Sequence, residues 1–113
     1  MGVETPATRL VVFLTEDDRI GRRCTAEVLL ERAREAGLAG ATILQAVEGF
    51  GRGGRLRAAR LPDLARGLPL LLEVVDDDSR VEAFLPVVRE VAPGALVTLD
   101  PVEVDRPGPG AAG

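Results

Sequence analysis

The chain has 113 residues and a formal net charge of −4 at pH 7, from 14 basic and 18 acidic side chains. This length predicts one domain, and the acidic balance argues against general binding to nucleic acid. The chain contains no histidine and one cysteine, Cys24. The most common general base and metal ligand is therefore absent, and an internal disulfide and a cysteine-based zinc site are excluded.

Both ends of the chain are expected to lie outside the domain, which is predicted over residues 8–106. Residues 1–7 are polar and contain a proline, which predicts a flexible N-terminus without a signal peptide. Residues 107–113 consist of Pro, Gly and Ala, which predicts a disordered tail. No apolar run approaches the roughly 18–20 residues of a membrane span. We therefore expect a cytoplasmic protein that is not inserted in a membrane.

The first half of the chain predicts a strand, a helix and a second strand. Residues 10–14 form an apolar run with two β-branched residues, which is typical of a buried strand. After a turn, apolar residues recur at helical spacing. This helix is expected to begin at Cys24 or Thr25 and to end near Gly37. Residues 41–48 predict the second strand.

The second half repeats this order. Residues 70–75 predict a third strand, and a second helix is expected after the acidic residues 76–78. Ser79 and Glu82 have the spacing of a capping box, in which each side chain satisfies a free backbone N–H at the helix start. Pro86 is expected to kink this helix or to tighten its first turns.

The second helix is expected to end at Pro93 and Gly94, before a fourth strand at 95–99 and a short fifth strand at 102–104. The resulting β-α-β-β-α-β order is that of an α+β, ferredoxin-like sandwich. We expect two helices on one face of a four-stranded antiparallel sheet. In this fold the third strand lies between the first and the second.

The first and third strands lack the apolar–polar alternation of a sheet with one face in water. Two helices can cover only one face, and each large apolar side chain left exposed costs roughly 1.5–3 kcal/mol relative to burial. We therefore expect a homo-oligomer that closes one sheet against another. The alternative is a monomer whose second face is only partly apolar.

The connection between the second and third strands, residues 49–67, is far longer than the about 2–5 residues that a hairpin needs. It is rich in glycine, and five arginines face one acid, Asp63. Such long connections are usually functional or disordered. Residues 61–65 are expected to form a short helical turn. The charge suits an anionic ligand or an acidic patch on a partner, and the candidate partner-binding residues are Arg55, Arg57 and Arg60.

Strand direction brings three connections to one edge of the predicted sheet: residues 15–23, 49–67 and 92–95. We expect a ligand site there, because guanidinium groups offer paired donors to phosphate or carboxylate. Glycines beside Phe50 would let a ligand approach the backbone. Alternatively, the arginines only keep a mobile loop soluble and Phe50 belongs to the core. The candidate ligand-binding residues are Arg19, Arg22, Gly49, Phe50, Gly51, Arg52, Pro93 and Gly94.

Two acidic clusters allow other interpretations. The carboxylates of Glu16, Asp17 and Asp18 could ligate a hard metal ion, or they could pair with nearby arginines. Residues 76–78 lie at the opposite edge of the predicted sheet, where capping of the second helix is favoured. The two clusters therefore cannot share a metal within one protomer. No cofactor is predicted.

Six segments stand out along residues 9–105: residues 16–19, 21–22, 31–42, 48–51, 68–69 and 81–86. Together they closely resemble an uncharacterised bacterial family of PII-like proteins. Members of that family look like the trimeric PII signal-transduction proteins and the CutA proteins. Their genes often lie beside, or are fused to, those of fluoride-exporting channels.

The resemblance implies a homotrimer with ligand clefts between subunits and a long loop, residues 49–67, that docks onto targets. PII proteins bind nucleotides in those clefts. This sequence departs from them in the connection after the second helix, residues 92–95, which contains no lysine. The phosphate-binding lysine of PII proteins therefore has no counterpart here.

Two function hypotheses follow. The first is a PII-like regulatory protein that senses a small anionic metabolite or nucleotide and acts on a channel, transporter or enzyme. The 49–67 loop would change its order on binding. The alternative is a CutA-like ion-binding or ion-tolerance protein that uses the carboxylates of residues 16–18. An enzyme is not expected, because no nucleophile–base pair and no Gly-rich loop with lysine is visible.

Overall fold

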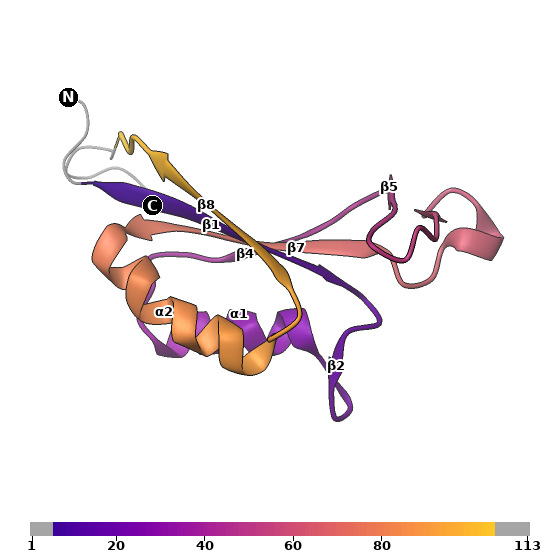
Figure 1. Cartoon of the computed structure of the whole chain (residues 1–113), viewed down its shortest axis with the longest axis horizontal. Helices are drawn as coiled ribbons and strands as arrows, with labels where there is room; N and C mark the ends of the chain where they lie inside the picture. Colours follow the sequence, from indigo (N-terminus) through magenta and orange to yellow (C-terminus); the bar gives the residue numbers. More distant parts are fainter. Residues whose placement is uncertain (1–5, 106–113) are drawn as a thin grey trace, which may run out of the picture.

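The computed structural model describes residues 6–105, which form a four-stranded antiparallel sheet with two helices on one face (Figure 1). The strand order is β4-β7-β1-β8. This order confirms the predicted ferredoxin-like arrangement, with the third long strand between the first and the second. The main elements are β1 (Ala7–Thr15), α1 (Thr25–Glu35), β4 (Thr42–Gln45), β7 (Pro69–Asp77), α2 (Asp78–Val91) and β8 (Leu96–Val102).

The hydrophobic core lies between the sheet and the two helices. Alternate residues of β1, such as Leu10 and Val12, point toward the helices because side chains of a strand alternate between its faces. Leu29 of α1 and Phe84 of α2 pack against them and are almost completely buried. Neither helix in the described part of the chain is long and apolar enough to cross a membrane.

The first helix begins and ends where the sequence predicts. It starts at Thr25, after an extended Cys24. Gly37 follows its end with a φ of 77°, a left-handed conformation that glycine adopts without strain. Between β1 and this helix, the predicted turn contains a small hairpin of β2 (Arg19–Ile20) and β3 (Arg23–Cys24).

The capping box predicted at Ser79 and Glu82 is not formed. The helix begins at Asp78. Its N-cap residue is Asp77, two positions before Ser79, and Asp77 provides no side-chain cap. The Asp78 N–H donates to the Pro6 carbonyl at 3.2 Å, and its carboxylate accepts the Thr8 hydroxyl at 2.6 Å. Contacts with the start of β1 therefore replace the local motif. The helix continues through Pro86 to Val91.

The predicted second strand is shorter than expected. Only Thr42–Gln45 pairs with β7, and the chain leaves the sheet after the Ala46 N–H donates to the Pro69 carbonyl. Glu48–Gly49 forms a separate strand, β5, which pairs with β6 (Arg57–Ala58). A 3₁₀ turn, η1 (Pro62–Leu64), confirms the predicted helical turn. We call residues 46–67 the basic arm, which projects beyond the sheet (Figure 1).

The fourth strand is longer than expected, and the predicted fifth strand is wrong. β8 runs through Pro101 to Val102, with Pro101 opposite Thr8 of β1. Proline is tolerated here because β8 is an edge strand that needs hydrogen-bond donors on one side only. The first strand also starts earlier than the predicted boundary, since Ala7 is a buried residue of β1. Residues 1–5 and the tail predicted at 107–113 lie outside the described part of the chain.

The sheet face away from the helices is apolar in one row and charged in another. Register places four apolar side chains side by side across all four strands: Leu44, Leu71, Phe13 and Leu96. Nearer the other end, the Arg9 guanidinium pairs with Glu73 at 2.6 Å and with Asp100 at 3.6 Å. Within one chain this face is therefore only partly apolar, and the apolar row lies toward the basic arm.

Candidate functional site

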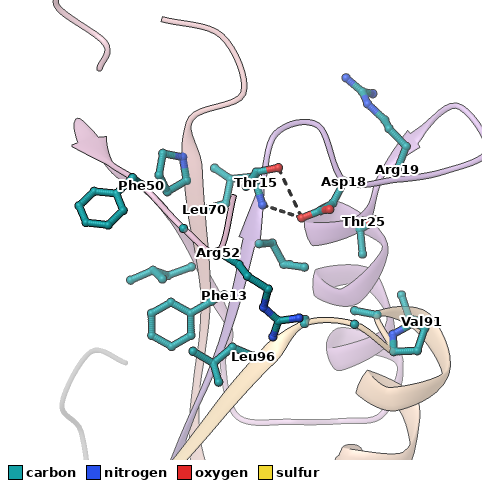
Figure 2. A pocket seen from close by; sticks show the side chains of 18 residues that line it. Phe13, Thr15, Asp18, Arg19, Thr25, Phe50, Arg52, Leu70, Val91 and Leu96 are labelled. Atoms are coloured by element: carbon teal, nitrogen blue, oxygen red, sulfur yellow. Dashed lines mark hydrogen bonds between the residues drawn. The ribbon is translucent and has the colours of Figure 1, made fainter. Parts of the chain in front are cut away.

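A cleft of about 690 Å³ lies at the edge of the sheet from which the basic arm departs (Figure 2). All three connections predicted to converge line this cleft. The segment around the β1–β2 turn contributes Thr15, Asp18 and Arg19. The arm contributes Phe50, Gly51 and Arg52, and the α2–β8 connection contributes residues 92–95. The convergence follows from the antiparallel register, because β1 ends at the edge where β7 and β8 begin.

The apolar side of the cleft is formed by residues that sequence reasoning did not single out. Phe13 and Leu96 lie opposite each other on the uncovered face and are 40% and 60% exposed. Leu71 pairs with Phe13 from the other side. The missing alternation in the first strand was the available signal, since Phe13 is an aromatic residue directed away from the helices. The cleft is thus continuous with the apolar row.

Arg52 supplies positive charge to the cleft. Its side chain extends from the arm toward the α2–β8 connection (Figure 2). Within residues 6–105 its guanidinium makes no hydrogen bond or ion pair, whereas Arg57 and Arg60 of the same arm do. A guanidinium without a protein partner, next to an apolar wall, can accept a phosphate or carboxylate as its partner.

The two arginines of the β2–β3 hairpin differ in position. Arg19 lines the cleft, but its side chain points outward in Figure 2, and its Nη1 donates to the Arg22 carbonyl at 3.3 Å. Arg22 occupies the turn between β2 and β3, is exposed and does not line the cleft. The structure therefore brings Arg19 to the rim and leaves Arg22 outside.

The two glycines and the aromatic residue at the root of the arm also differ in whether they line the cleft. Phe50 lines the cleft and is 74% exposed, so the alternative that it belongs to the core is wrong. Gly51 lines the cleft beside it. Gly49 is in β5, outside the cleft, and a side chain there would press against Pro69.

The candidate partner-binding arginines have different surroundings. Arg55 is exposed and makes no ion pair among the described residues. Arg57 lies in β6 and its Nη2 is 3.9 Å from Asp17 Oδ2. Arg60 donates to Glu48 at 3.1 Å within the arm. Arg57 therefore pairs with the body of the protein and Arg60 within the arm, whereas Arg55 is exposed.

The three carboxylates of residues 16–18 point to different partners. Glu16 accepts hydrogen bonds from the Leu68 N–H and the Gln45 amide. Asp17 pairs with an arm arginine, and Asp18 accepts the Thr15 N–H at 2.7 Å. No group of three or more metal-ligating side chains occurs among residues 6–105. The metal hypothesis for this cluster gains no support.

Asp76 and Asp78 have structural contacts at the opposite edge. Asp76 is 3% exposed and accepts the Ala39 N–H at 2.8 Å and the Asp77 N–H at 2.7 Å. It therefore ties the connection after α1 to the end of β7. Asp78 accepts the Thr8 hydroxyl, as described above. Helix capping by these side chains, which the sequence favours, is replaced by bonds to other segments.

Sequence comparison places the chain among proteins of one family. Residues 7–104 match the DUF190 family, described as "Uncharacterized ACR". Two UPF0166 proteins of Aquifex aeolicus (strain VF5) are similar to it. One is 36% identical over 95 residues, which span 84% of this chain and 90% of that protein. The other is 32% identical over 78 residues, which span 69% and 81%.

Solved structures with the same fold come from PII-like and CutA proteins. CPII from Thiomonas intermedia K12, bound to ADP and bicarbonate, has a TM-score of 0.61 and 21% identity, covering 89% of this chain and 90% of CPII. CutA from Synechococcus elongatus PCC7942 has a TM-score of 0.57 and 16% identity, covering 90% and 82%. At these identities the likeness shows the fold. The match over residues 7–104 and the 36% identical relative show that the chain, which has this fold, belongs to the DUF190 family.

Proposed function

We propose that this protein is a cytoplasmic, PII-like regulatory protein that binds a small anionic metabolite or nucleotide in the cleft beside Arg52. The ligand would alter the order of the basic arm, which would then act on a channel, transporter or enzyme. The observation that carries the proposal is a cleft in which the Arg52 guanidinium, unpaired within residues 6–105, stands beside an apolar wall. The proposal involves binding without turnover.

The size and chemistry of the cleft favour a nucleotide over a small inorganic anion. Small-molecule sites usually have volumes of about 300–1,000 Å³, and this cleft has about 690 Å³. Phe13 and Phe50 line it and offer aromatic faces for a base. Arg52 could hold the phosphate without a lysine in the α2–β8 connection. Because the PII-like protein CPII is bound to ADP and bicarbonate, these two are the first probes.

We further propose that the protein is a homotrimer whose subunits cover the apolar row of the uncovered face. The row of four apolar residues crosses the whole sheet and ends in the cleft. Covering Phe13 and Leu96 with a second copy would remove apolar surface from water and deepen the cleft at the same place. The alternative of a stable monomer would leave this row in solvent.

Thermal-shift measurements with ADP and, separately, with bicarbonate test the proposed ligand class. A ligand that binds only the native state raises the midpoint of unfolding. ADP should raise it for the wild type and not for Arg52→Ala. Arg55→Ala is the matched control, because Arg55 belongs to the same arm and carries the same charge but does not line the cleft.

Three results would count against the proposal. ADP and bicarbonate could both leave the midpoint of the wild type unchanged. ADP could stabilise Arg52→Ala and Arg55→Ala equally, which would place its site elsewhere. The purified protein could release inorganic phosphate from ATP and lose this activity in Arg52→Ala. That result would identify the protein as an enzyme that hydrolyses ATP in this cleft.

A further inference from the structure

The turn that follows β1 contacts the two residues that flank the basic arm, the middle of the arm and its last residue. We infer that Glu16 and Asp17 form a latch that keeps the arm against the body of the protein. The latch thereby keeps Phe50 and Arg52 in the wall of the cleft. This inference concerns the position of the arm and is independent of the ligand proposed above.

Glu16 joins the two roots of the arm. Its backbone N–H donates to the Leu68 carbonyl at 3.0 Å, and its Oε1 accepts the Leu68 N–H at 2.9 Å. Its Oε2 accepts a hydrogen bond from Gln45 Nε2. Gln45 ends β4 just before the arm, and Leu68 follows the last arm residue. One carboxylate therefore ties together the two residues that flank the arm.

Asp17 contacts the middle of the arm and its last residue. Its carboxylate pairs with Arg57, whose side chain is only 19% exposed. Gly67 is buried and has a φ of 66°, and a Cβ at this position would overlap Oδ2 of Asp17. Glycine both adopts this backbone conformation and leaves room for the carboxylate. The Asp17 carboxylate therefore lies against the backbone at the end of the arm.

The same turn reaches the cleft. Asp18 lines the cleft, and its Oδ2 accepts the Thr15 N–H, which closes the turn. Adjacent residues thus contact the arm and the cleft. Displacement of the arm together with its two flanking residues would break the hydrogen bonds of Glu16 and remove Phe50 and Arg52 from the cleft wall. Glu16 is expected to contribute more than Asp17, because exposed ion pairs stabilise weakly.

Limited digestion of the full-length protein with trypsin tests the latch without any ligand. Trypsin cleaves after arginine, and the arm offers five sites: Arg52, Arg55, Arg57, Arg60 and Arg66. Glu16→Ala should raise the rate of arm cleavage about threefold to tenfold, because a larger fraction of the molecules would have the arm detached from the body of the protein. Asp17→Asn should raise it by up to about threefold. Cleavage at each site is followed by mass spectrometry under native conditions.

Glu31→Ala is the control, because Glu31 is an exposed carboxylate paired with Arg23 outside the arm. Its rate should equal that of the wild type. An increase confined to Glu16→Ala and Asp17→Asn supports the latch. Arm cleavage of Glu16→Ala at the rate of Glu31→Ala would overturn it, whatever the outcome of the ADP experiment.

A pair of glycine variants provides a second test should Glu16→Ala fail to fold. Gly67→Ala and Gly54→Ala both place a side chain at positive φ, 66° and 75°, within the arm. Only Gly67→Ala pushes on Asp17, because nothing lies within 4 Å of a Cβ built at Gly54. Cleavage after Arg60, which is distant in sequence from both glycines, should be about threefold faster in Gly67→Ala. Equal rates in the two variants would refute the latch.

Discussion

Phe13 and Leu96 lie directly opposite each other on β1 and β8, on the sheet face that the helices leave uncovered. Both also line the cleft. The surface that a second copy is proposed to cover therefore adjoins the surface that is proposed to bind a ligand. Assembly is expected to favour ligand binding, because a second copy would deepen the cleft beside this pair of side chains.

Leu96→Glu should dissociate the proposed trimer while leaving the fold of each chain intact. Leu96 is largely exposed in the single chain, so a charge there changes the stability of the chain by about 0.5 kcal/mol or less. Leu99→Glu is the control, because Leu99 is also exposed on β8 but its register partner is Leu10 of the helix-covered face. Sedimentation velocity should report a trimer for Leu99→Glu and a monomer for Leu96→Glu. A monomeric wild type at micromolar concentration would refute the trimer.

Phe50→Ala should weaken ADP binding about fivefold to tenfold, corresponding to loss of about 1–1.5 kcal/mol of aromatic stacking. Its free energy of unfolding should change little, because Phe50 is 74% exposed. Val47→Ala is matched in exposure, at 76%, but Val47 does not line the cleft. Isothermal titration with ADP and urea unfolding would be measured for both variants. Equal ADP affinities would remove Phe50 from the site.

Asp76→Ala should lower the free energy of unfolding by about 1–3 kcal/mol, because it removes the two hydrogen bonds that the buried carboxylate accepts from the Ala39 and Asp77 N–H groups. Ser79→Ala is an informative comparison. The capping-box motif predicts a cost of about 1 kcal/mol for it, whereas no side-chain cap is present in the structure. We expect Ser79→Ala to be within about 0.5 kcal/mol of the wild type in urea unfolding. The reverse order of the two costs would contradict the described start of α2.

Glu31 should titrate below the pKa of an unpaired glutamate. Its carboxylate accepts a hydrogen bond from Arg23 at 2.8 Å, and this bond and the positive charge of Arg23 lower the pKa of Glu31. Because the folded-state pKa is lowered, the associated stability is present above the unfolded pKa and is lost as pH falls through the folded pKa. Nuclear magnetic resonance titration should show the pKa rising in Arg23→Ala. High salt should reduce the shift, because the pair is exposed.

The long elements were predictable because their signals are local. The apolar run at residues 10–14 and the helical spacing after Thr25 depend only on neighbours along the chain. Strand direction then sufficed to bring three connections to one edge, where they do line one cleft. Arg52 lies at this edge, as strand direction predicts. Nothing in the local sequence distinguishes Arg52 from Arg55, which does not line the cleft.

The errors arose where distant contacts outweigh local motifs. The start of α2 is determined by Pro6 and Thr8, which are about 70 residues away, so the capping-box spacing of Ser79 has no effect. The second strand stops at Gln45 because the next residue of β7 in this register is Pro69, the first of that strand, which has no backbone N–H to donate. The predicted end of the fourth strand before Pro101 was wrong, because a proline interrupts a central strand but is tolerated in an edge strand such as β8.

Local sequence patterns alone thus determined the helices, through the spacing of their apolar residues, and the central strands, through their apolar runs. The tertiary structure decided which arginine faces the cleft and how the basic arm is held. Those features depend on contacts such as that between Glu16 and Leu68, 52 positions apart. Such contacts form only after the sheet has brought its ends together, and no local pattern encodes them.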